Sequence, residues 1–210
     1  TLSYAAKPDR NRLMNLAADY LTAGGFTEIM SNSLTKESYY EGLTSYPAAR
    51  CVRILNPLSA DLNVMRQTLL FNTMEAVQLN ANRRNGNLRL YEFGNCYFYD
   101  EAARDAEKPL SAYSEQYRLA IAVTGAAVPQ SWNAKPQASS FFTLRAVAEK
   151  LLRRFGLDIY ALKCEPLQSD LFGDGISLSA GNGRELLQMG VVAPRIRRAF
   201  DLKQEVYYLE

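Results

Sequence analysis

The chain has 210 residues, of which 48% are hydrophobic and 22% are charged, and this composition fits one soluble globular domain. Its formal charge of +2 arises from 24 basic and 22 acidic residues. So even a balance argues neither for nor against a nucleic-acid partner, but it excludes a protein that binds polyanions through its overall charge.

Histidine is absent, which excludes Ser-His and Cys-His nucleophilic pairs, histidine general bases and nearly every zinc site. The cysteines, Cys51, Cys96 and Cys164, are scattered without metal-ligand spacing, as is typical of a reducing compartment. There is no signal peptide, and no apolar run approaches the roughly 20 residues that span a bilayer. We therefore expect a cytoplasmic protein without a membrane partner. Because the chain opens on Thr1, we expect residues 1–210 to be a single domain excised from a longer polypeptide.

The N-terminal third begins with apolar residues at helical spacing, which predict a helix over residues 9–23 with Asp9 as its N-cap. Imperfect alternation after Gly24-Gly25 predicts a strand over residues 26–33. The next expected elements are a helical turn at residues 36–42, a short strand at 53–55 and a helix at 68–82.

The middle third has a turn signal at Asn85-Gly86, which leads into two predicted strands that hinge at Gly94-Asn95. The charged stretch that follows them predicts a loop. In chain order we expect strands at residues 88–93 and 96–99, a loop at 101–115, a strand at 118–124 and a loop at 126–136.

The last third opens with a strongly periodic helix and continues with strands joined in a hairpin across Gly181-Asn182-Gly183. Strands in hairpins with helices between them favour an antiparallel α+β sheet over parallel βαβ units. We expect a helix at residues 141–155, strands at 158–163, 176–180 and 186–192, a helix at 194–200 and a strand at 205–209.

Three parts of the chain, the last of them in two pieces, resemble a known family in matching order. Residues 7–34 read KPDRNRLMNLAADYLTAGGFTEIMSNSL and resemble motif 1 of class II aminoacyl-tRNA synthetases. Residues 56–98 read NPLSADLNVMRQTLLFNTMEAVQLNANRRNGNLRLYEFGNCYF and are similar to the central block of bacterial phenylalanine–tRNA ligase β subunits. The segments FFTLRAVAEKLLRRFGLDIY and QMGVVAPRIRRAFDLKQEVYYLE resemble the end of the same C-terminal catalytic-like core module.

This resemblance implies a class II synthetase-like fold, an antiparallel sheet flanked by helices. It also implies an assembly of two α and two β subunits that attaches phenylalanine to tRNA(Phe). In the assembly that the resemblance implies, the α subunit handles phenylalanine, ATP with its magnesium and the acceptor end of the tRNA. The β module resembles a synthetase core that has lost its chemistry.

The catalytic motifs of the class are broken in this sequence. Aligning YEFGNCYFYD on the Phe-Arg-x-Glu pattern of motif 2 places Tyr97 at the aromatic, Phe98 at the phosphate-binding arginine and Asp100 at the glutamate. Phenylalanine cannot neutralise a phosphate, so we expect adenylation to be absent. Asn32 stands where motif 1 ends in proline, and motif 3 is not found. We expect no catalytic, cofactor-binding or metal-binding residue in this domain.

Two charged residues are candidates for a functional site. Arg66 stands where a class II core can carry a substrate-facing arginine, but a structural arginine paired with a carboxylate near a helix start is the favoured interpretation. Glu92 lacks neighbouring carboxylates for a metal site, which favours a salt bridge or a solvent-facing residue.

Partner contacts have two sets of candidates. The apolar stripe of the first helix fits core packing and contact with the α subunit equally well. A short basic cluster near the C-terminus is a candidate for tRNA contact, although a solvated face is favoured because the cluster lacks interleaved aromatics. The stripe consists of Leu13, Leu16, Ala17, Tyr20 and Leu21, and the cluster of Arg195, Arg197 and Arg198.

Three functional hypotheses remain open at this point. The first is a non-catalytic module that supports the α subunit by subunit assembly and tRNA positioning. The second is an active adenylate-forming ligase domain with rearranged residues, against which Phe98 argues. The third is a free-standing RNA-binding domain, against which the near-zero net charge argues.

Overall fold

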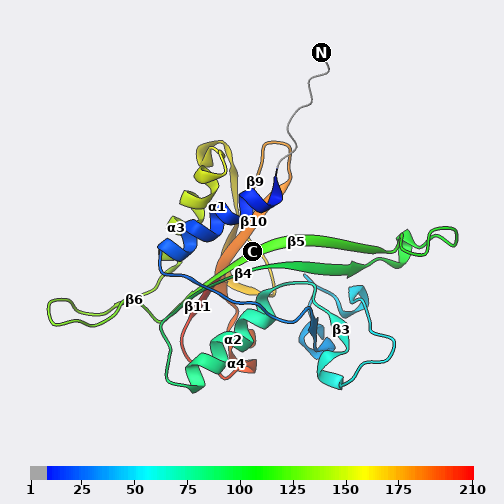
Figure 1. Cartoon of the computed structure of the whole chain (residues 1–210), viewed down its shortest axis with the longest axis horizontal. Coiled ribbons are helices and arrows are strands. Elements are labelled where there is room, and N and C mark those ends of the chain that lie inside the picture. Colours follow the sequence, from blue (N-terminus) through cyan, green and yellow to red (C-terminus); the bar gives the residue numbers. More distant parts are fainter. Residues whose placement is uncertain (1–8) are drawn as a thin grey trace, which may run out of the picture.

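The computed structural model describes residues 9–210 as a seven-stranded sheet with helices on both faces (Figure 1). The strand order is β1-β4-β5-β11-β10-β9-β8, and every neighbouring pair is antiparallel except β1 with β4. This confirms the predicted α+β class. The strands are β1 (Thr27–Glu28), β4 (Leu88–Tyr99), β5 (Tyr113–Thr124), β8 (Lys163–Pro166), β9 (Phe172–Ser179), β10 (Glu185–Val192) and β11 (Val206–Leu209).

Within residues 9–210 four helices cover the sheet, and all four match the predicted ranges within two residues. Their ends carry the expected caps: Asp9 accepts hydrogen bonds from the backbone of the first helix, and Ser140 and Thr143 form a capping box on the third. The helices are α1 (Arg10–Ala23), α2 (Leu70–Asn82), α3 (Phe141–Arg154) and α4 (Pro194–Ala199).

The sheet separates two apolar clusters. On one face α1 and α3 pack through Ala17, Leu21 and Leu144 onto β5, β10 and β11. On the other face α2, α4 and the segment between α1 and α2 pack onto the even-numbered residues of β4 and β5. Because the side chains of a strand alternate between faces, Phe98 and Cys96 both lie on this second face.

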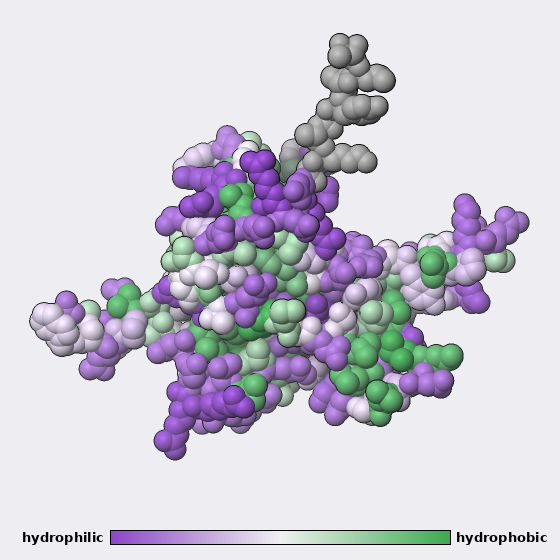
Figure 2. Space-filling view, viewed as in Figure 1, coloured by the Kyte–Doolittle hydropathy of each residue, from purple (hydrophilic) through white to green (hydrophobic). Residues whose placement is uncertain are grey.

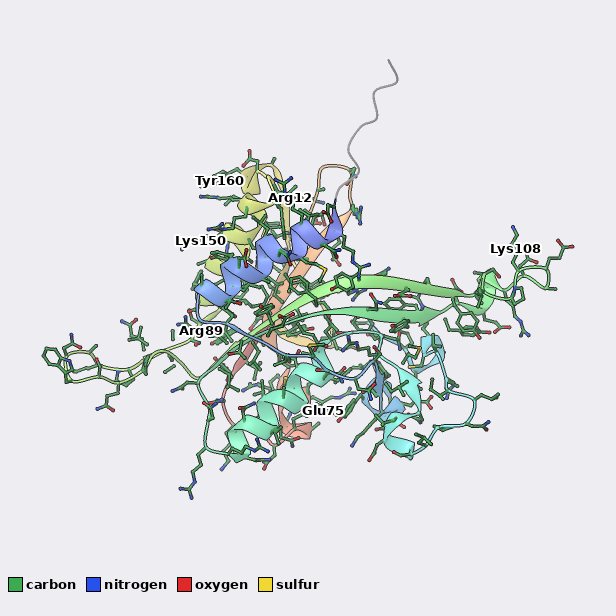
Figure 3. The ribbon with its side chains drawn as sticks, viewed as in Figure 1. Arg12, Glu75, Arg89, Lys108, Lys150 and Tyr160 are labelled. Atoms are coloured by element: carbon green, nitrogen blue, oxygen red, sulfur yellow. The ribbon has the colours of Figure 1, made fainter. Side chains whose placement is uncertain are left out.

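Short elements complete the fold. Two hairpins project from its body, the long β4–β5 pair and the short β6–β7 pair (Figure 1). Figure 3 places Lys108 at the outer end of the long hairpin and Tyr160 at the opposite side of the molecule. The remaining elements are β2 (Leu34–Thr35), β3 (Val64–Met65), β6 (Ala126–Val128), β7 (Gln137–Ala138) and the 3-10 turns at Glu37–Tyr40, Ala48–Arg50, Ala60–Leu62, Glu101–Ala103 and Ile159–Ala161.

Two strand predictions near the centre were wrong. The strands expected at 88–93 and 96–99 form one continuous strand, β4, because Gly94 is not a hinge. A Cβ built at Gly94 would lie 2.1 Å from Nη2 of Arg66, so the glycine makes room for that side chain. The strand expected from residue 118 begins at Tyr113, because the long hairpin stays paired as far as Tyr99.

Other predicted strands are shorter or shifted. Only Thr27 and Glu28 of the range 26–33 pair with β4, and the chain then leaves the sheet. The range 53–55 forms a single bridge, from Arg53 to Val64. Residues 159–161 form a 3-10 turn, since the Asp158 side chain accepts a hydrogen bond from the backbone of Tyr160, and the strand starts at Lys163.

Candidate functional site

Phe98 lies near the end of β4, beneath two guanidinium groups. Its side chain is 6% exposed, and its ring stacks on Tyr46 with 6.5 Å between centroids. The guanidinium carbons of Arg50 and Arg118 lie 5.6 Å and 5.3 Å from the ring centroid. The position aligned with the motif 2 arginine therefore carries an aromatic ring. The positive charges beside this ring belong to Arg50 and Arg118, which come from two other segments.

The guanidinium of Arg118 forms hydrogen bonds and an ion pair with other residues of the chain. Its Nη1 donates to the hydroxyl of Tyr46 and to the carboxylate of Glu210, both at 2.8 Å, and its Nη2 donates to the Gln116 amide oxygen at 2.7 Å. Burial acts to lower the pKa of Arg118, but Glu210 and Tyr46 outweigh it, so this pKa lies above its ordinary value. Glu210 thus neutralises the charge that Arg118 brings to Phe98.

Glu210 joins several elements through one carboxylate. Its Oε2 accepts hydrogen bonds from the Tyr208 hydroxyl at 2.6 Å, from the Leu69 backbone at 3.2 Å and from the Thr68 hydroxyl. Leu69 and Thr68 precede α2, whose N-terminal dipole favours a negative charge there. Burial, and then the nearby Glu210, raise the pKa of the Cys96 thiol. These bonds make Glu210 a structural hub beneath the site.

A small cavity of about 240 Å³ opens beside Phe98. Arg50, Gln67, Gln116 and Arg118 are among the side chains that line it. Gln67 is fully buried, and its Oε1 has no hydrogen-bond partner among residues 9–210. Arg50 is exposed and forms no ion pair within the same residues. The cavity therefore offers one uncompensated positive charge.

These residues do not fit a magnesium-bound triphosphate. Such a ligand needs several fixed positive charges on its phosphates and carboxylates on its metal. Asp100, aligned with the motif 2 glutamate, is exposed and accepts a hydrogen bond from the Ala102 backbone at 3.1 Å. Within residues 9–210 no three His, Cys, Asp or Glu side chains gather as metal ligands. The arrangement holds the fold together and lacks the set of charges that such a ligand needs.

Arg66 and Glu92 form a buried ion pair with 2.7 Å between Nη1 and Oε1. Arg66 also donates from Nε to the backbone oxygen of Asn95, at 3.0 Å. The Ser31 backbone and hydroxyl donate to the two carboxylate oxygens of Glu92, at 3.1 Å and 2.9 Å. This confirms the structural interpretation of both residues. Asn32, next to Ser31, is an exposed turn residue whose Oδ1 accepts from the backbone of Leu34.

The α1 stripe divides between core and surface. Ala17 and Leu21 are fully buried in the chain's own core, which corrects the interface interpretation for these two, because a side chain without exposed surface offers no area to a partner. Leu16 and Tyr20 are half-buried, and Arg154 stacks on the Tyr20 ring. Leu13 is 43% exposed, so it is the stripe residue that projects most into solvent.

The basic cluster lies on α4. Arg195 and Arg198 are exposed and Arg197 is half-buried. Each donates one hydrogen bond to a backbone oxygen, of Glu41, Pro194 and Val192 respectively, which fixes the side chains and leaves further donors outward. Arg197 and Arg198 also line a shallow groove with Lys203.

The sequence analysis did not predict one exposed apolar surface. Leu55 and Leu58 are almost fully exposed on the loop between Cys51 and β3. Figure 2 shows hydrophobic residues gathered over this part of the molecule, below the long hairpin. The signal available was apolar leucines beside Pro57 in an otherwise polar loop. Exposed apolar groups that adjoin one another are typical of protein interaction sites.

Solved structures define the class of fold. Over 97% of this chain and 66% of theirs, two structures of a pyrrolysyl tRNA synthetase from Desulfitobacterium hafniense superpose with a TM-score of 0.69. Sequence identity is 16% for one and 15% for the other, so the likeness concerns the fold alone. The protein has the fold of a class II aminoacyl-tRNA synthetase catalytic domain.

Sequence comparison gives the family. The model of the phenylalanyl tRNA synthetase beta chain CLM domain matches residues 1–210, and the chain belongs to this family. The phenylalanine–tRNA ligase beta subunit of Bacteroides thetaiotaomicron is 46% identical over 95% of the chain, and that of Porphyromonas gingivalis is 37% identical over all of it. The chain spans about a quarter of these relatives, 24% and 26% of their lengths. No helix in residues 9–210 has the length and apolar character needed to cross a membrane.

Proposed function

We propose that this domain is a non-catalytic module of a phenylalanine–tRNA ligase β subunit. It supports an α subunit in the ATP-dependent attachment of phenylalanine to tRNA(Phe) by subunit assembly and tRNA positioning. The main support is that Phe98 occupies the position of the phosphate-binding arginine. In addition, the neighbouring Arg118 is paired with Glu210.

The charges around Phe98 support this proposal. Of the two guanidiniums against Phe98, Arg118 is neutralised by a buried carboxylate, so Arg50 alone faces the cavity with a free charge. Adenylation brings an anionic carboxylate to an anionic phosphate, and one exposed arginine offsets little of that repulsion. ATP and magnesium therefore bind to the α subunit in this proposal. The assembly consists of two α and two β chains and works in the cytoplasm.

Docking on the α subunit uses exposed apolar residues. Leu13 on α1 is the residue of the predicted stripe that is most accessible to a partner. Leu55 and Leu58 form a second exposed apolar surface. Burying such side chains in a partner contributes about 1.5–3 kcal/mol each. A stable contact of this kind buries roughly 1,200–2,000 Å² in total, so either surface is the centre of a larger interface.

Contact with tRNA is assigned to Arg195, Arg197 and Arg198. Bonds to backbone oxygens hold their guanidiniums in place, which lowers the entropy lost when they meet phosphates. The contact adds to affinity without reading sequence, because phosphate contacts position a protein and base contacts specify.

The docking proposal is tested by co-purification of an α subunit with the β subunit carrying Leu58→Asp or Leu13→Asp. Either substitution should weaken association at least about tenfold while leaving the melting temperature nearly unchanged, since both side chains are exposed. Leu79→Asp, at an exposed leucine on α2, is the matched control. Unchanged association in both variants would refute docking through these residues.

Two separate assays test the hypotheses of an active ligase and of a free RNA-binding domain. ATP–pyrophosphate exchange by this chain would establish the first. Salt-sensitive tRNA binding by the chain alone would establish the second. We expect neither, and we expect Arg195→Gln together with Arg198→Gln to weaken tRNA binding only in the assembled enzyme.

A further inference from the structure

The β6–β7 hairpin projects from the body of the fold and carries a tryptophan at its tip (Figure 1). An antiparallel bridge between Ser131 and Ala134 closes the hairpin, so Trp132 lies in its two-residue turn. Trp132 is 96% exposed. Packing within the described chain therefore does not account for this large aromatic ring, whereas contact with another molecule would.

The residues beside Trp132 are polar. Its neighbours along the chain are Ser131 and Asn133, and the Ser131 hydroxyl donates a hydrogen bond to Oδ1 of Asn133 at 2.9 Å. Val128, which is 40% exposed, lies toward the base of the hairpin. A protein pocket that takes up a tryptophan also buries an apolar patch around it, whereas a nucleobase stacks on a single aromatic face. Trp132 therefore fits a base better than a hydrophobic pocket.

The hairpin belongs to a part of the molecule that is poor in negative charge. Asp and Glu are absent from residues 116–148, which contain the hairpin, and from residues 76–91, which contain the end of α2 and the start of β4. The two segments meet at the base of the hairpin, where the Ala126 backbone donates to Oδ1 of Asn87 at 2.8 Å. Arg89 lies at the same base and donates to the hairpin backbone at 2.6 Å (Figure 3). The fold thus joins two segments that do not repel a polyanion.

Arg83, Arg84 and Lys135 supply the positive charge of this surface. All three are exposed, and none of them forms an ion pair within residues 9–210. Arg84 has a φ of 63°, a left-handed conformation that glycine adopts most readily at a helix end. The dipole of α2 favours a cation at this end, but it does not require an arginine in place of a glycine. An arginine held there at a conformational cost points to a use of its side chain.

The same surface continues to the basic cluster of α4. Nε2 of Gln204 donates to the backbone oxygen of Gly86 at 2.8 Å, so the loop after α2 lies against the residues that follow α4. Lys203, next to Gln204, lines the groove that also contains Arg198. The acidic residues of this stretch are Asp201 and Glu205. The positive charge is therefore least compensated at the loop after α2 and on the hairpin.

We propose that the β6–β7 hairpin and the loop after α2 bind a single-stranded part of an RNA. An unpaired base stacks on Trp132, and the phosphates near it meet Lys135, Arg83 and Arg84. The RNA is the tRNA of the proposed function, on which this assignment rests. At about 3.3 Å per residue the tip lies roughly 20 Å beyond Ala126, so it reaches a base in a loop or at an end of the RNA.

The role of the ring is tested in the assembled α–β enzyme by the dissociation constant of labelled tRNA. We expect Trp132→Ala to weaken binding at least about tenfold and Trp132→Phe to restore most of the affinity, because a phenyl ring still stacks on a base. Tyr160→Ala is the matched control, at an aromatic residue that is 85% exposed on the opposite side of the molecule (Figure 3). Equal affinities of the Trp132→Ala and Tyr160→Ala enzymes would overturn the proposal.

The role of the cations is tested by the salt dependence of the same dissociation constant. Arg83→Gln together with Arg84→Gln should make the slope of log affinity against log salt concentration shallower by about 1.4, at roughly 0.7 for each phosphate contact of a single strand. Trp132→Ala should leave this slope unchanged, because stacking releases no counterions. Lys150→Gln together with Arg153→Gln, at exposed residues of α3, is the matched control. A slope that the Arg83 and Arg84 substitutions do not alter would contradict the phosphate contacts.

Photo-cross-linking from position 132 identifies the molecule that the hairpin contacts. With p-benzoylphenylalanine in place of Trp132, we expect a cross-link to tRNA in the assembled enzyme. A cross-link to the α subunit, or loss of the α subunit from the Trp132→Ala enzyme, would overturn the proposal, because the tip would then bind protein. Affinity for tRNA that falls with Arg195→Gln and Arg198→Gln but not with Trp132→Ala would refute this RNA contact and leave the proposed function intact. Unaltered affinity in both would count against both.

Discussion

Arg66 and Glu92 form an ion pair inside the protein, with side chains that are only 4% and 1% exposed. Arg66 precedes α2 and Glu92 lies in β4, so the pair ties a helix start to the sheet. Ser31 and the backbone of Asn95 supply the remaining hydrogen bonds. Removing one member would leave the other charge buried without its partner, which is far costlier than the loss of an exposed pair.

Glu92→Gln should therefore lower the free energy of unfolding by about 3–5 kcal/mol, as measured by urea denaturation. Glu149→Gln is the matched control, since Glu149 pairs with Arg145 on the partly exposed surface of α3. Its expected cost is below about 0.5 kcal/mol. Equal effects in the two variants would mean that the buried pair is not a structural determinant.

Gly94→Ala should destabilise the protein by about 1–3 kcal/mol, because the new methyl group would meet Nη2 of Arg66 at 2.1 Å. Gly173→Ala in β9 is the control: its nearest neighbour would lie at 3.6 Å, an ordinary contact. Thermal unfolding of the two variants measures the difference. A Gly94→Ala protein as stable as the control would show that Gly94 is not needed to accommodate Arg66.

The sequence predicted the helices well and the centre of the sheet poorly. Helices were found because apolar spacing and caps are local signals, such as Asp9 before α1 and Ser140 before α3. Gly94-Asn95 resembled a hinge locally, whereas the reason for the glycine is Arg66, a residue distant in sequence. Tertiary contacts of this kind leave no periodic trace in a single sequence.

The site shows the same limit. The aromatic ring at position 98 was evident from the sequence, and so was a structural role for Arg66. The approach of Arg50 and Arg118 to that ring was not, because they come from a 3-10 turn and from the facing strand. The engagement of Arg118 by Glu210 depends on the pairing of β5 with β11, which no local pattern specifies.

Asp170 should make stability depend on acidity. Burial acts to raise the pKa of Asp170, but hydrogen bonds from Ser45 and Thr44 outweigh it, so this pKa lies below its ordinary value of 3.8. A lowered pKa contributes stability that is present above the ordinary pKa and lost as the pH falls through the folded-state pKa. Asp170→Asn should thus cost about 1–2 kcal/mol at neutral pH, with the difference closing below a pH of about 4.

Urea unfolding of the Asp170→Asn variant and the parent protein at neutral and acidic pH measures this closing gap. Asp158→Asn, at an exposed carboxylate that accepts one backbone hydrogen bond, is the comparison. A stability difference for Asp170→Asn that stays constant with pH would contradict the assignment.

The three cysteines should differ in reactivity. Burial raises the pKa of Cys51 and, together with Glu210, that of Cys96, so both thiols stay protonated and shielded, whereas Cys164 is exposed. Iodoacetamide at pH 8 should label Cys164 in the folded protein at least about tenfold faster than the other two, as read by peptide mass spectrometry. Rapid labelling of Cys96 would mean that the Glu210 hub opens readily.

The most direct test of the central claim is ATP–pyrophosphate exchange by an assembled α–β enzyme whose α subunit has lost its own activation step. We predict background exchange with the natural β subunit, and the same with Phe98→Arg in β, because Arg118 remains neutralised by Glu210 and no metal-binding carboxylates gather among residues 9–210. Phenylalanine-dependent exchange above background that disappears with Arg50→Gln in β would contradict this account.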